Sequence, residues 1–558
     1  MSECIQFKPA NCKDCHKCIR HCPVKSIRFS GHQANIVGDE CILCGHCFVV
    51  CPQNAKQIRN DVPSAKALLA GGAPVYVSLA PSFVANYEGA TLTSMDAALR
   101  RLGFAGAEET ALGATVVKRE YDRMTYDGAH SVILSSCCHT VNLLIQKYYP
   151  QALPYLAHVL SPMQAHCTDL KRRHPDAKTV FIGPCISKKD EAERYPGIVD
   201  CALTFEELTE WLQEANVSIP QMEDTGAAGK ARLFPTTGGI LRSMAADNPA
   251  YTYLAIDGVE NCMQVLEDVI GGKLDHCFIE MSACVGSCIG GPAMDRNRRA
   301  PVSEFVAVNR YAGREDFPVE QPAAEALQKH MGELDTHRVM PGTAAIEAVL
   351  REMGKFTPEQ ELNCGSCGYN TCREKAAAVL QGKAELSMCL PYLAERAQSF
   401  SENIIRSTPN AILVLNDALE IQQLNNAACR LMHIEDPRSL IGEQVLRLLD
   451  PTPFLELQRT GRGQSHQRVY LEEYQKHVDE TLVIDRSHHL IICILRDVTE
   501  EETARAARVA LSRTTIEVTD RVIEKQMRTV QEIASLLGET TAETKVALTK
   551  LKESLRYE

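Results

Sequence analysis

Residues 12–23 read CKDCHKCIRHCP and residues 41–52 read CILCGHCFVVCP, and these two stretches decide the fold of the N-terminal part of the chain. Each stretch holds four cysteines at the spacing C-x2-C-x2-C-x3-C and ends in a proline. Thiolates are strong ligands for both iron and zinc. Zinc sites usually place their thiols in two separated pairs, and disulfides need an oxidising compartment, so this spacing favours iron–sulfur clusters.

The two runs resemble those of the bacterial two-cluster ferredoxins. In that family the fourth cysteine of each run binds the cluster of the other run. The resemblance therefore implies two 4Fe–4S clusters in a ferredoxin-like module over residues 1–60. One cluster would be held by Cys12, Cys15, Cys18 and Cys51, and the other by Cys41, Cys44, Cys47 and Cys22.

Composition limits what the rest of the chain can be. Its 558 residues are enough for several domains, and its net charge of -12 argues against a nucleic-acid partner. It contains no apolar run of the ~18 residues that a membrane span needs, and no secretory signal at its N-terminus. Twenty-four cysteines without such a signal are typical of a reducing compartment, so we expect a cytoplasmic protein.

Apolar β-rich stretches alternate with helical patterns from about residue 65 to residue 350. Strands are expected at 74–79, 131–134 and 179–182, and each ends at a loop suited to a functional site. This alternation predicts an α/β region with a doubly wound sheet, whose sites lie beyond the carboxyl ends of the strands.

Three loops of this region carry further cysteines. The loops are Ser135-Ser-Cys137-Cys138, Gly183-Pro-Cys185-Ile-Ser-Lys188 and Cys284-Val-Gly-Ser-Cys288-Ile-Gly-Gly291. Cys284 and Cys288 are four residues apart, so on a helical turn both could face one metal site. The nearby glycines allow close backbone approach, and Lys188 adds a cation beside any anion that Cys185 helps to bind.

The order and sequence of these loops resemble the three cluster-binding motifs of the FeFe-hydrogenases, and the resemblance extends to about residue 310. It implies an H-cluster domain, over residues 65–350, that catalyses H2 ⇌ 2 H+ + 2 e−. The H-cluster is a 4Fe–4S cubane joined to a two-iron subsite with CO, cyanide and dithiolate ligands. By this resemblance the cubane is held by Cys138, Cys185, Cys284 and Cys288.

The same resemblance implies roles for individual residues. Cys288 also bridges to the two-iron subsite, and Lys188 hydrogen-bonds one of its cyanides. Cys137 passes protons to the amine of the dithiolate. Glu120 and Glu191 fall on relay glutamates of the family.

Several positions depart from the family pattern. The methionines that the family has two residues before the second-loop and third-loop cysteines are Gly183 and Ser282 here, which predicts a roomier, wetter or differently hydrogen-bonded pocket. His139 stands where the family usually has proline. The relay serine falls on Ala157, which cannot carry a proton. We therefore expect slow turnover.

A third cysteine group and a sensor-like segment follow. Residues 356–395, with Cys364, Cys367, Cys372 and Cys389, resemble a small 4Fe–4S domain often appended to electron-transfer and sensory proteins. Four thiols can also bind zinc, but the long last gap and the neighbouring clusters favour iron. Residues 396–500 resemble a PAS domain, a five-stranded antiparallel sensor fold, and end in Asp497-Val-Thr499.

The tail, residues 501–558, has a helical pattern throughout. Its apolar residues Ile516, Ile523, Val530 and Leu537 recur every seven residues, and Gly538 is expected to end the first helix. This pattern predicts a helical hairpin that dimerises or signals, and we expect a homodimer.

The whole arrangement predicts a multidomain α+β and α/β protein: a ferredoxin-like two-cluster module, an FeFe-hydrogenase H-cluster domain, a small 4Fe–4S domain, a PAS domain and a C-terminal helical hairpin. It resembles the sensory class of FeFe-hydrogenases, in which H2 or the redox state would be passed to a partner phosphatase or kinase. The expected redox partner is a ferredoxin, and maturation proteins must install the two-iron subsite. Two alternatives remain: a metabolic hydrogenase linked to ferredoxin, and an iron–sulfur scaffold without hydrogenase activity.

Overall fold

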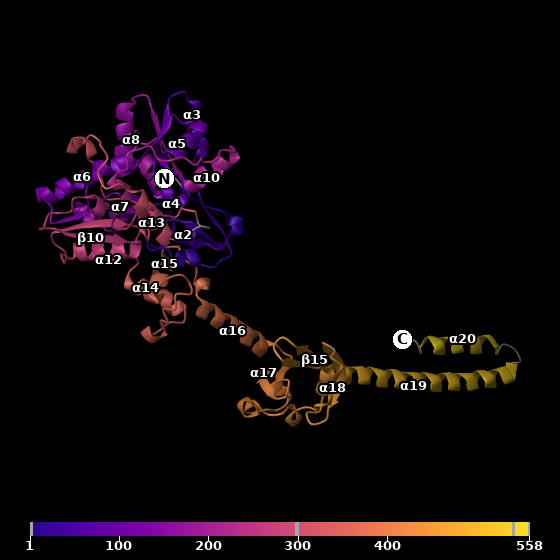
Figure 1. Cartoon of the computed structure of the whole chain (residues 1–558). Helices are drawn as coiled ribbons and strands as arrows, with labels where there is room; N and C mark the ends of the chain where they lie inside the picture. The colour runs from indigo at the N-terminus through magenta and orange to yellow at the C-terminus, as the bar shows by residue number, and fades with distance from the viewer. Residues whose placement is uncertain (1–3, 296–300, 462, 538–541, 556–558) are drawn as a thin grey trace. The chain divides into compact units, whose positions relative to one another are not determined.

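The computed structural model describes residues 4–295, 301–461, 463–537 and 542–555 (Figure 1). The chain divides into two compact units, Met1–Leu393 and Ala394–Glu558. Each unit is described by itself. Gly538, the expected end of the first tail helix, lies outside the described residues.

The N-terminal module has two small antiparallel sheets. Strand β1 (Ile5–Phe7) pairs with β4 (Lys56–Ile58), and β2 (Ile27–Ser30) pairs with β3 (Gln33–Ile36). Each cysteine run contains one short helix, α1 (Lys17–Arg20) or α2 (His46–Val49), which follows a residue in the left-handed conformation. The cysteines of each run lie in or beside its short helix, and the buried residues Ile19, Ile27 and Ile42 belong to an apolar core that continues into the following α/β region.

Two parallel sheets follow, instead of the one doubly wound sheet that the sequence predicts. The first has the order β6-β5-β8-β9, with β6 (Gly106–Glu109), β5 (Val75–Leu79), β8 (Lys178–Gly183) and β9 (Cys201–Thr204). The second has the order β10-β11-β7, with β10 (Thr252–Asp257), β11 (Cys277–Ser282) and β7 (Val132–Leu134). Strand β11 is buried along its whole length, as expected for a central parallel strand covered on both faces.

Helices surround the two sheets. Helix α6 (Ala111–Asp127) packs on α8 (Pro162–Arg173), and the backbones come so close that a Cβ at Gly113 would lie 2.3 Å from the carbonyl oxygen of Pro162. Helices α7 (His139–Tyr148) and α9 (Ser187–Arg194) begin just after β7 and β8. The other helices of this region are α3 (Val62–Ala70), α4 (Phe83–Asn86), α5 (Leu92–Arg101), α10 (Phe205–Glu214), α11 (Gly239–Ser243), α12 (Val259–Ile270) and α13 (Pro301–Tyr311).

The third cysteine group lies in a small helical segment of the first unit. Helix α14 (Thr343–Glu352) packs on α15 (Cys372–Leu380) through a separate apolar cluster that contains Val349, Leu350 and Ala376. Cys389 directly precedes α16 (Leu390–Ser407) and its carbonyl accepts a hydrogen bond from the N–H of Leu393. A thiol of the third group therefore stands at the first turn of α16.

The second unit contains the five-stranded antiparallel sheet that the sequence predicts for residues 396–500. Its order is β13-β12-β16-β15-β14, with β12 (Ala411–Asn416), β13 (Ile421–Leu424), β14 (Gln464–Leu471), β15 (Lys476–Asp485) and β16 (Leu490–Asp497). Helices α17 (Asn426–Leu431) and α18 (Thr452–Thr460) lie between the strands in sequence, and Phe454 and Leu413 are fully buried in the core.

The tail is a pair of helices, α19 (Thr499–Leu537) and α20 (Ala542–Ser554), which lie side by side (Figure 1). Ile516, Ile523 and Val530 are half-buried, and Lys552 pairs with Asp520 at 3.1 Å. These seam residues therefore lie on the face of α19 that α20 covers. Among the described residues no helix has both the length and the apolar character of a bilayer-spanning segment.

Candidate metal-cluster site

The cysteine-bearing loops of the α/β region each follow a parallel strand, and the loops lie close together in the folded chain. Strand β7 leads into Cys137 and Cys138, β8 into Cys185, and β11 into Cys284 and Cys288. Strands β7 and β11 are neighbours in one parallel sheet, so their loops meet at its carboxyl edge, while the loop after β8 comes from the other parallel sheet and lines the same cavity. Cys138 is also the residue that caps the N-terminus of α7.

The loops enclose a cavity of about 110 Å³. Its lining includes the thiols or side chains of Cys137, Cys138, Cys185, Lys188 and Cys288. The pKa of Cys288 is raised to about 12, mainly by burial and also by the thiols of Cys185 and Cys138, while Lys188 opposes the rise. Thiols that oppose one another's ionisation, beside one cation, fit a positively charged metal group that would hold them all as thiolates.

Cys284 takes a different position from the one that a helical turn would give it. Gly286 lies in the left-handed region, with a φ of 81°, and only Ser287–Gly290 is helical, as a 3-10 turn. Cys284 contributes to the raised pKa of Cys44, for which burial is the main cause. Cys284 therefore lies near Cys44 of the ferredoxin-like module and is not part of the cavity lining described above.

Lys188 is held in place from two sides. Its Nζ donates to the carbonyl oxygen of Cys137 at 3.1 Å and pairs with Oε2 of Glu191 at 2.5 Å. An ammonium has three N–H groups, so one donor remains for a ligand in the cavity that Lys188 lines. This geometry suits the binding of an anionic group such as cyanide.

Cys137 has a second partner that the sequence does not reveal. Its Sγ lies 3.2 Å from the hydroxyl of Tyr121, which also contacts Ser136. Burial raises the pKa of Cys137 to about 12, while Tyr121 and Lys188 lower it. Cys137 is therefore a thiol, suited to carry a proton, and Tyr121 fixes its orientation.

The two glutamates that match the family relay do not contact each other directly. Glu120 pairs with Arg123, with Nε to Oε2 at 3.0 Å, and lines a cavity of about 700 Å³. Glu191 is fully buried and bonded to Lys188, Lys329 and the hydroxyl of Ser161. Lys329 lines the same cavity as Glu120.

Lys329 therefore contacts Glu191 and also lines the cavity that Glu120 lines. Val159 pairs with Gln328 as an antiparallel bridge, and the N–H of Lys329 donates to the carbonyl of His158. This backbone pairing sets Lys329 beside the segment that contains Ala157. No motif in the sequence points to Lys329, because its position depends on that bridge.

Three positions that depart from the family pattern, Gly183, His139 and Ser282, have defined surroundings. A Cβ at Gly183 would lie 2.6 Å from Cζ of Phe181, so the Phe181 ring already fills the space next to the glycine. The roomier pocket expected from Gly183 is therefore wrong at that position. His139 is buried, with Nε2 2.8 Å from Oδ2 of Asp190 and Nδ1 3.9 Å from Oε1 of Glu191. Ser282 lines the cavity.

The ferredoxin-like module brings its eight cysteines into two groups. Burial raises the pKa of Cys18 to about 11, and Cys15, Cys51 and Cys12 also raise it while Lys56 lowers it. Burial likewise raises the pKa of Cys47, and Cys41, Cys44 and Cys22 add to that rise. These electrostatic neighbours are the same residues that the ferredoxin resemblance groups together, and their role as cluster ligands stays a prediction.

The third group also closes around one cavity. Cys364, Cys367, Cys372 and Cys389 all line it, with Tyr369 and Lys375. Among the described residues, no three cysteine, histidine or carboxylate side chains approach closely enough to hold a single metal ion.

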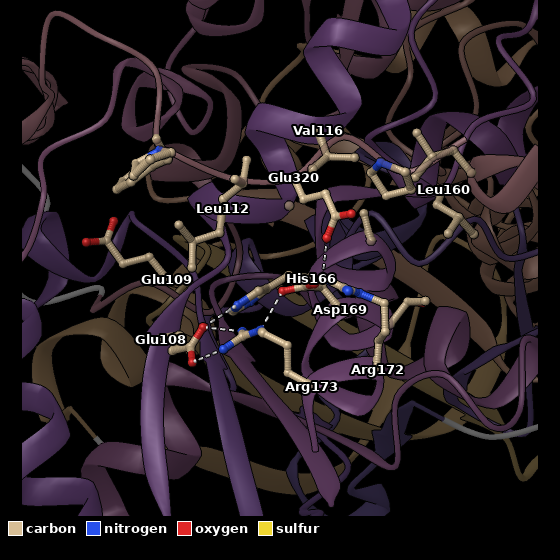
Figure 2. Close-up of a pocket in the computed structure, with 18 of the residues that line it drawn as sticks. Glu108, Glu109, Leu112, Val116, Leu160, His166, Asp169, Arg172, Arg173 and Glu320 are labelled. Carbon is tan, nitrogen blue, oxygen red and sulfur yellow. Dashed lines mark hydrogen bonds and ion pairs between the residues drawn. The ribbon is translucent and has the colours of Figure 1, made fainter. Parts of the chain in front are cut away.

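A larger cavity, of about 500 Å³, lies elsewhere in this unit, between α6, α8 and the segment 317–327. Figure 2 shows that charged side chains on its wall pair with one another: Glu108 with His166 and Arg173, and Glu320 with Arg172. Within the part of the chain that the structure describes, no cysteine lines it. The cysteine cavity is therefore the better candidate for the chemistry.

Comparison with known proteins agrees with these observations. Residues 73–292 match the family model for the C-terminal domain of the iron-only hydrogenase large subunit. Residues 7–61 match a 4Fe–4S dicluster domain, 360–391 an Fe–S cluster family, and 399–498 the PAS fold.

Individual relatives are distant. The chain is 27% identical over 359 residues to a periplasmic Fe hydrogenase large subunit from Nitratidesulfovibrio vulgaris, and the match spans 51% of this chain and 85% of that protein. A ferredoxin from Saccharopolyspora erythraea is 46% identical over 46 residues, 8% of this chain and 43% of that protein. A solved FeFe-hydrogenase from Chlamydomonas reinhardtii has 18% identity and a TM-score of 0.41, covering 50% of this chain and all of that one (100%).

The order of these matches along the chain follows the order of the cysteine groups and the antiparallel sheet. The chain therefore has a region that matches the C-terminal domain of the iron-only hydrogenase large subunit, preceded by a match to a 4Fe–4S dicluster domain and followed by a match to the PAS fold.

Proposed function

We propose that the chain is an FeFe-hydrogenase that senses H2, or the redox state that H2 sets, and signals through its PAS domain and tail. The observation that carries this proposal is the convergence of Cys138, Cys185, Cys288 and Lys188 on one buried cavity, in a chain that also has a PAS fold. The domain limits that we propose are 1–60, 65–350, 356–395, 396–500 and 501–558.

The residues around the cavity suit an H-cluster. Cys138, Cys185, Cys284 and Cys288 would hold the cubane, and Cys288 would also join the two-iron subsite. Lys188 would donate its remaining N–H to a cyanide, in a pocket where little water weakens the bond. When bound, the H-cluster would supply the metal chemistry for H2 ⇌ 2 H+ + 2 e−.

The chain's own residues would move the protons. Cys137 faces the cavity and would exchange a proton with the group bound there. Glu191, paired with Lys188 and Lys329, would link this region to the cavity beside Glu120. In this link the buried ammonium of Lys329 takes the place of the hydroxyl of the family's relay serine. This change favours slow turnover.

The remaining cysteines would form an electron path. We propose two 4Fe–4S clusters in the N-terminal module and one at Cys364, Cys367, Cys372 and Cys389. Electrons would be exchanged with a partner such as ferredoxin, and a phosphatase or kinase would receive the signal from the tail of a homodimer. Maturation proteins would install the two-iron subsite.

Infrared spectroscopy of anaerobically matured protein, with and without H2, tests the proposal. Sharp CO and cyanide bands that shift under H2 would support it. Absence of those bands in protein with all its cubanes would instead indicate an iron–sulfur scaffold. Turnover of roughly hundreds per second or more would favour a metabolic hydrogenase over a sensor.

The link between the site and the signal needs its own test. Cys288→Ala should abolish the infrared bands and any H2-dependent change in the oligomeric state of the tail. If the H2 response survives in this variant, the site described above is not the sensor.

A further inference from the structure

The third cysteine group packs directly against the ferredoxin-like module. Gly368, with a φ of +91°, lies so close to α1 that a Cβ there would be 3.0 Å from Cβ of Ile19. The Arg20 side chain donates to the carbonyl oxygens of Gly365 and Ser366. The loop that carries Cys364 and Cys367 therefore packs against α1 at Ile19 and Arg20, which lie between Cys18 and Cys22.

Further contacts fix this interface. The N–H of Phe29 in β2 donates to the carbonyl of Lys383 at 2.7 Å, and the ammonium of Lys383 pairs with Glu40 although both side chains are buried. Breaking this pair would leave an uncompensated buried charge. The two modules therefore have a defined relative position within this unit.

Lys25 occupies the centre of the contact. Its Nζ donates to three carbonyl oxygens, those of Ile19 at 3.2 Å, Arg20 at 3.2 Å and Gly368 at 3.1 Å. All three N–H groups of the ammonium are thus used, and the acceptors come from both modules. A cation is held at one place between the second ferredoxin-type group and the third group.

Two neighbours of Lys25 belong to the two cysteine groups. Burial lowers the pKa of Lys25, while Cys22, Glu374 and Cys367 raise it. Burial also raises the pKa of Tyr369, and Cys367 and Cys22 raise it further. Cys22 and Cys367 therefore both lie near Lys25 and Tyr369. Cys44, which belongs to the same group as Cys22, lies near Cys284.

We propose that Lys25 is a redox-tuning residue at an electron-transfer contact between the cysteine group of Cys22, Cys41, Cys44 and Cys47 and the group of Cys364, Cys367, Cys372 and Cys389. This inference rests on the proposed function, since it assumes that both groups hold 4Fe–4S clusters. One electron from H2 oxidation leaves the first cluster, which is oxidised, and enters the second, which is reduced. No bond or proton is exchanged in this step.

The third cysteine group stands next in sequence to the helix that leads to the PAS fold. Cys389 precedes α16, the helix that leads through three residues to β12 of the PAS fold. Asn425 of that fold donates to the carbonyl of Ile405, near the end of α16. A change of charge at Cys389 is thus one helix away, along the chain, from the sensor fold.

The fixed charge of Lys25 favours reduction of both clusters, because reduction adds negative charge beside it. Lys25→Met should therefore lower the reduction potentials of these two clusters. We expect about a tenfold weaker affinity for the electron, which corresponds to about 59 mV for a one-electron couple. Lys25→Arg keeps the charge and should retain the wild-type potentials.

The measurement is a redox titration followed by electron paramagnetic resonance, on full-length protein that holds its cubanes but lacks the two-iron subsite. A Cys364→Ala/Cys367→Ala variant identifies the signals of the third cluster. Arg28→Met is the matched control, because Arg28 is an exposed cation on β2 of the same module. It should leave all potentials unchanged.

Each outcome decides a separate question. Unchanged potentials in Lys25→Met, or an equal shift in Arg28→Met, would overturn the role of Lys25 while leaving the proposed clusters intact. Iron analysis of the wild type that accounts for only the ferredoxin pair would overturn the third cluster itself, and the inference with it.

Discussion

Lys329 and Glu191 form an ion pair in which both side chains are completely buried. Burial by itself would raise the pKa of Glu191, but Lys188, Lys329 and His139 hold it well below its ordinary value. Glu191 is therefore a carboxylate that depends on two ammonium groups, one from α9 and one from the segment after α13.

Lys329→Met should weaken both stability and turnover. Glu191 would keep Lys188 but lose a buried counter-ion, at a cost of up to about 3 kcal/mol. We expect a lower thermal midpoint, and a fall in H2 activity of at least about tenfold at unchanged intensity of the CO and cyanide bands.

The double variant Lys329→Met/Glu191→Gln separates the two effects. It removes the buried carboxylate together with Lys329 but leaves Lys188 without its acidic partner, so it should recover only part of the thermal midpoint and none of the activity. A Lys329→Met protein as active per H-cluster as the wild type would show that protons reach the site by another route.

Gly183→Met tests whether Phe181 has taken the space of the family methionine. The new side chain would meet the Phe181 ring, and overpacking of a buried site costs typically about 1–3 kcal/mol. The single variant should contain fewer iron–sulfur clusters per chain and should have a lower thermal midpoint than the wild type. Phe181→Ala/Gly183→Met should regain stability because the methionine then occupies the vacated volume.

If Gly183→Met and Phe181→Ala/Gly183→Met are equally destabilised, the Phe181 ring does not occupy the space that a side chain at residue 183 would take. Phe181→Ala alone is the control, and it should show the loss expected of a cavity, about 3–5 kcal/mol.

The cysteine motifs are visible in the sequence because each is a short local pattern. The runs at Cys12 and Cys41 resemble those of two-cluster ferredoxins, and the loops after β7, β8 and β11 each contain a recognisable motif, so the cluster ligands stay predictions from resemblance. The five-stranded antiparallel sheet expected for the PAS fold is confirmed. These features depend on short-range patterns.

Other features depend on contacts between distant segments, which spacing does not encode. The split into two parallel sheets follows from strand pairing, such as β7 with β11, that skips many residues. Lys329 reaches Glu191, and Lys25 reaches Gly368, through contacts between segments that lie far apart in the sequence. The compensation of Gly183 by Phe181 similarly requires the register of β8 and its side-chain directions.

The buried carboxyl group of Glu280 should make the stability of the folded protein depend on pH. It lies on β11 and lines the cysteine cavity, and burial raises its pKa to about 7. Between about pH 4.5 and pH 7 the folded state keeps a proton that the unfolded state has lost. The contribution of this residue to stability is therefore present at low pH and is lost as the pH rises towards 7.

Glu280→Gln removes this titration. The thermal midpoint of the variant relative to the wild type should therefore rise as the pH increases from about 5 to about 7.5, by an amount that corresponds to about 3 kcal/mol. Parallel midpoints at all pH values would mean that Glu280 titrates alike in the folded and unfolded states.

The proposed homodimer has a candidate seam in α16. Leu390, Leu393, Ala397, Phe400 and Ile404 follow the alternating three-and-four spacing of a coiled coil. Phe400 is 67% exposed and Ile404 53% exposed, so a second copy of the same helix would bury them. Phe400→Glu should weaken dimerisation at least about a hundredfold, because each dimer loses two buried rings and gains two charges.

Sedimentation velocity of the full-length protein over a range of concentrations measures this effect. Ser399→Glu is the matched control, since Ser399 is exposed and adjacent but lies off the stripe, and it should dimerise like the wild type. The iron content of all three proteins should agree, which separates dissociation from misfolding. A wild type that stays monomeric, or a Phe400→Glu variant that dimerises as tightly as Ser399→Glu, would rule out α16 as the seam and leave α19 and α20 as the candidate contacts.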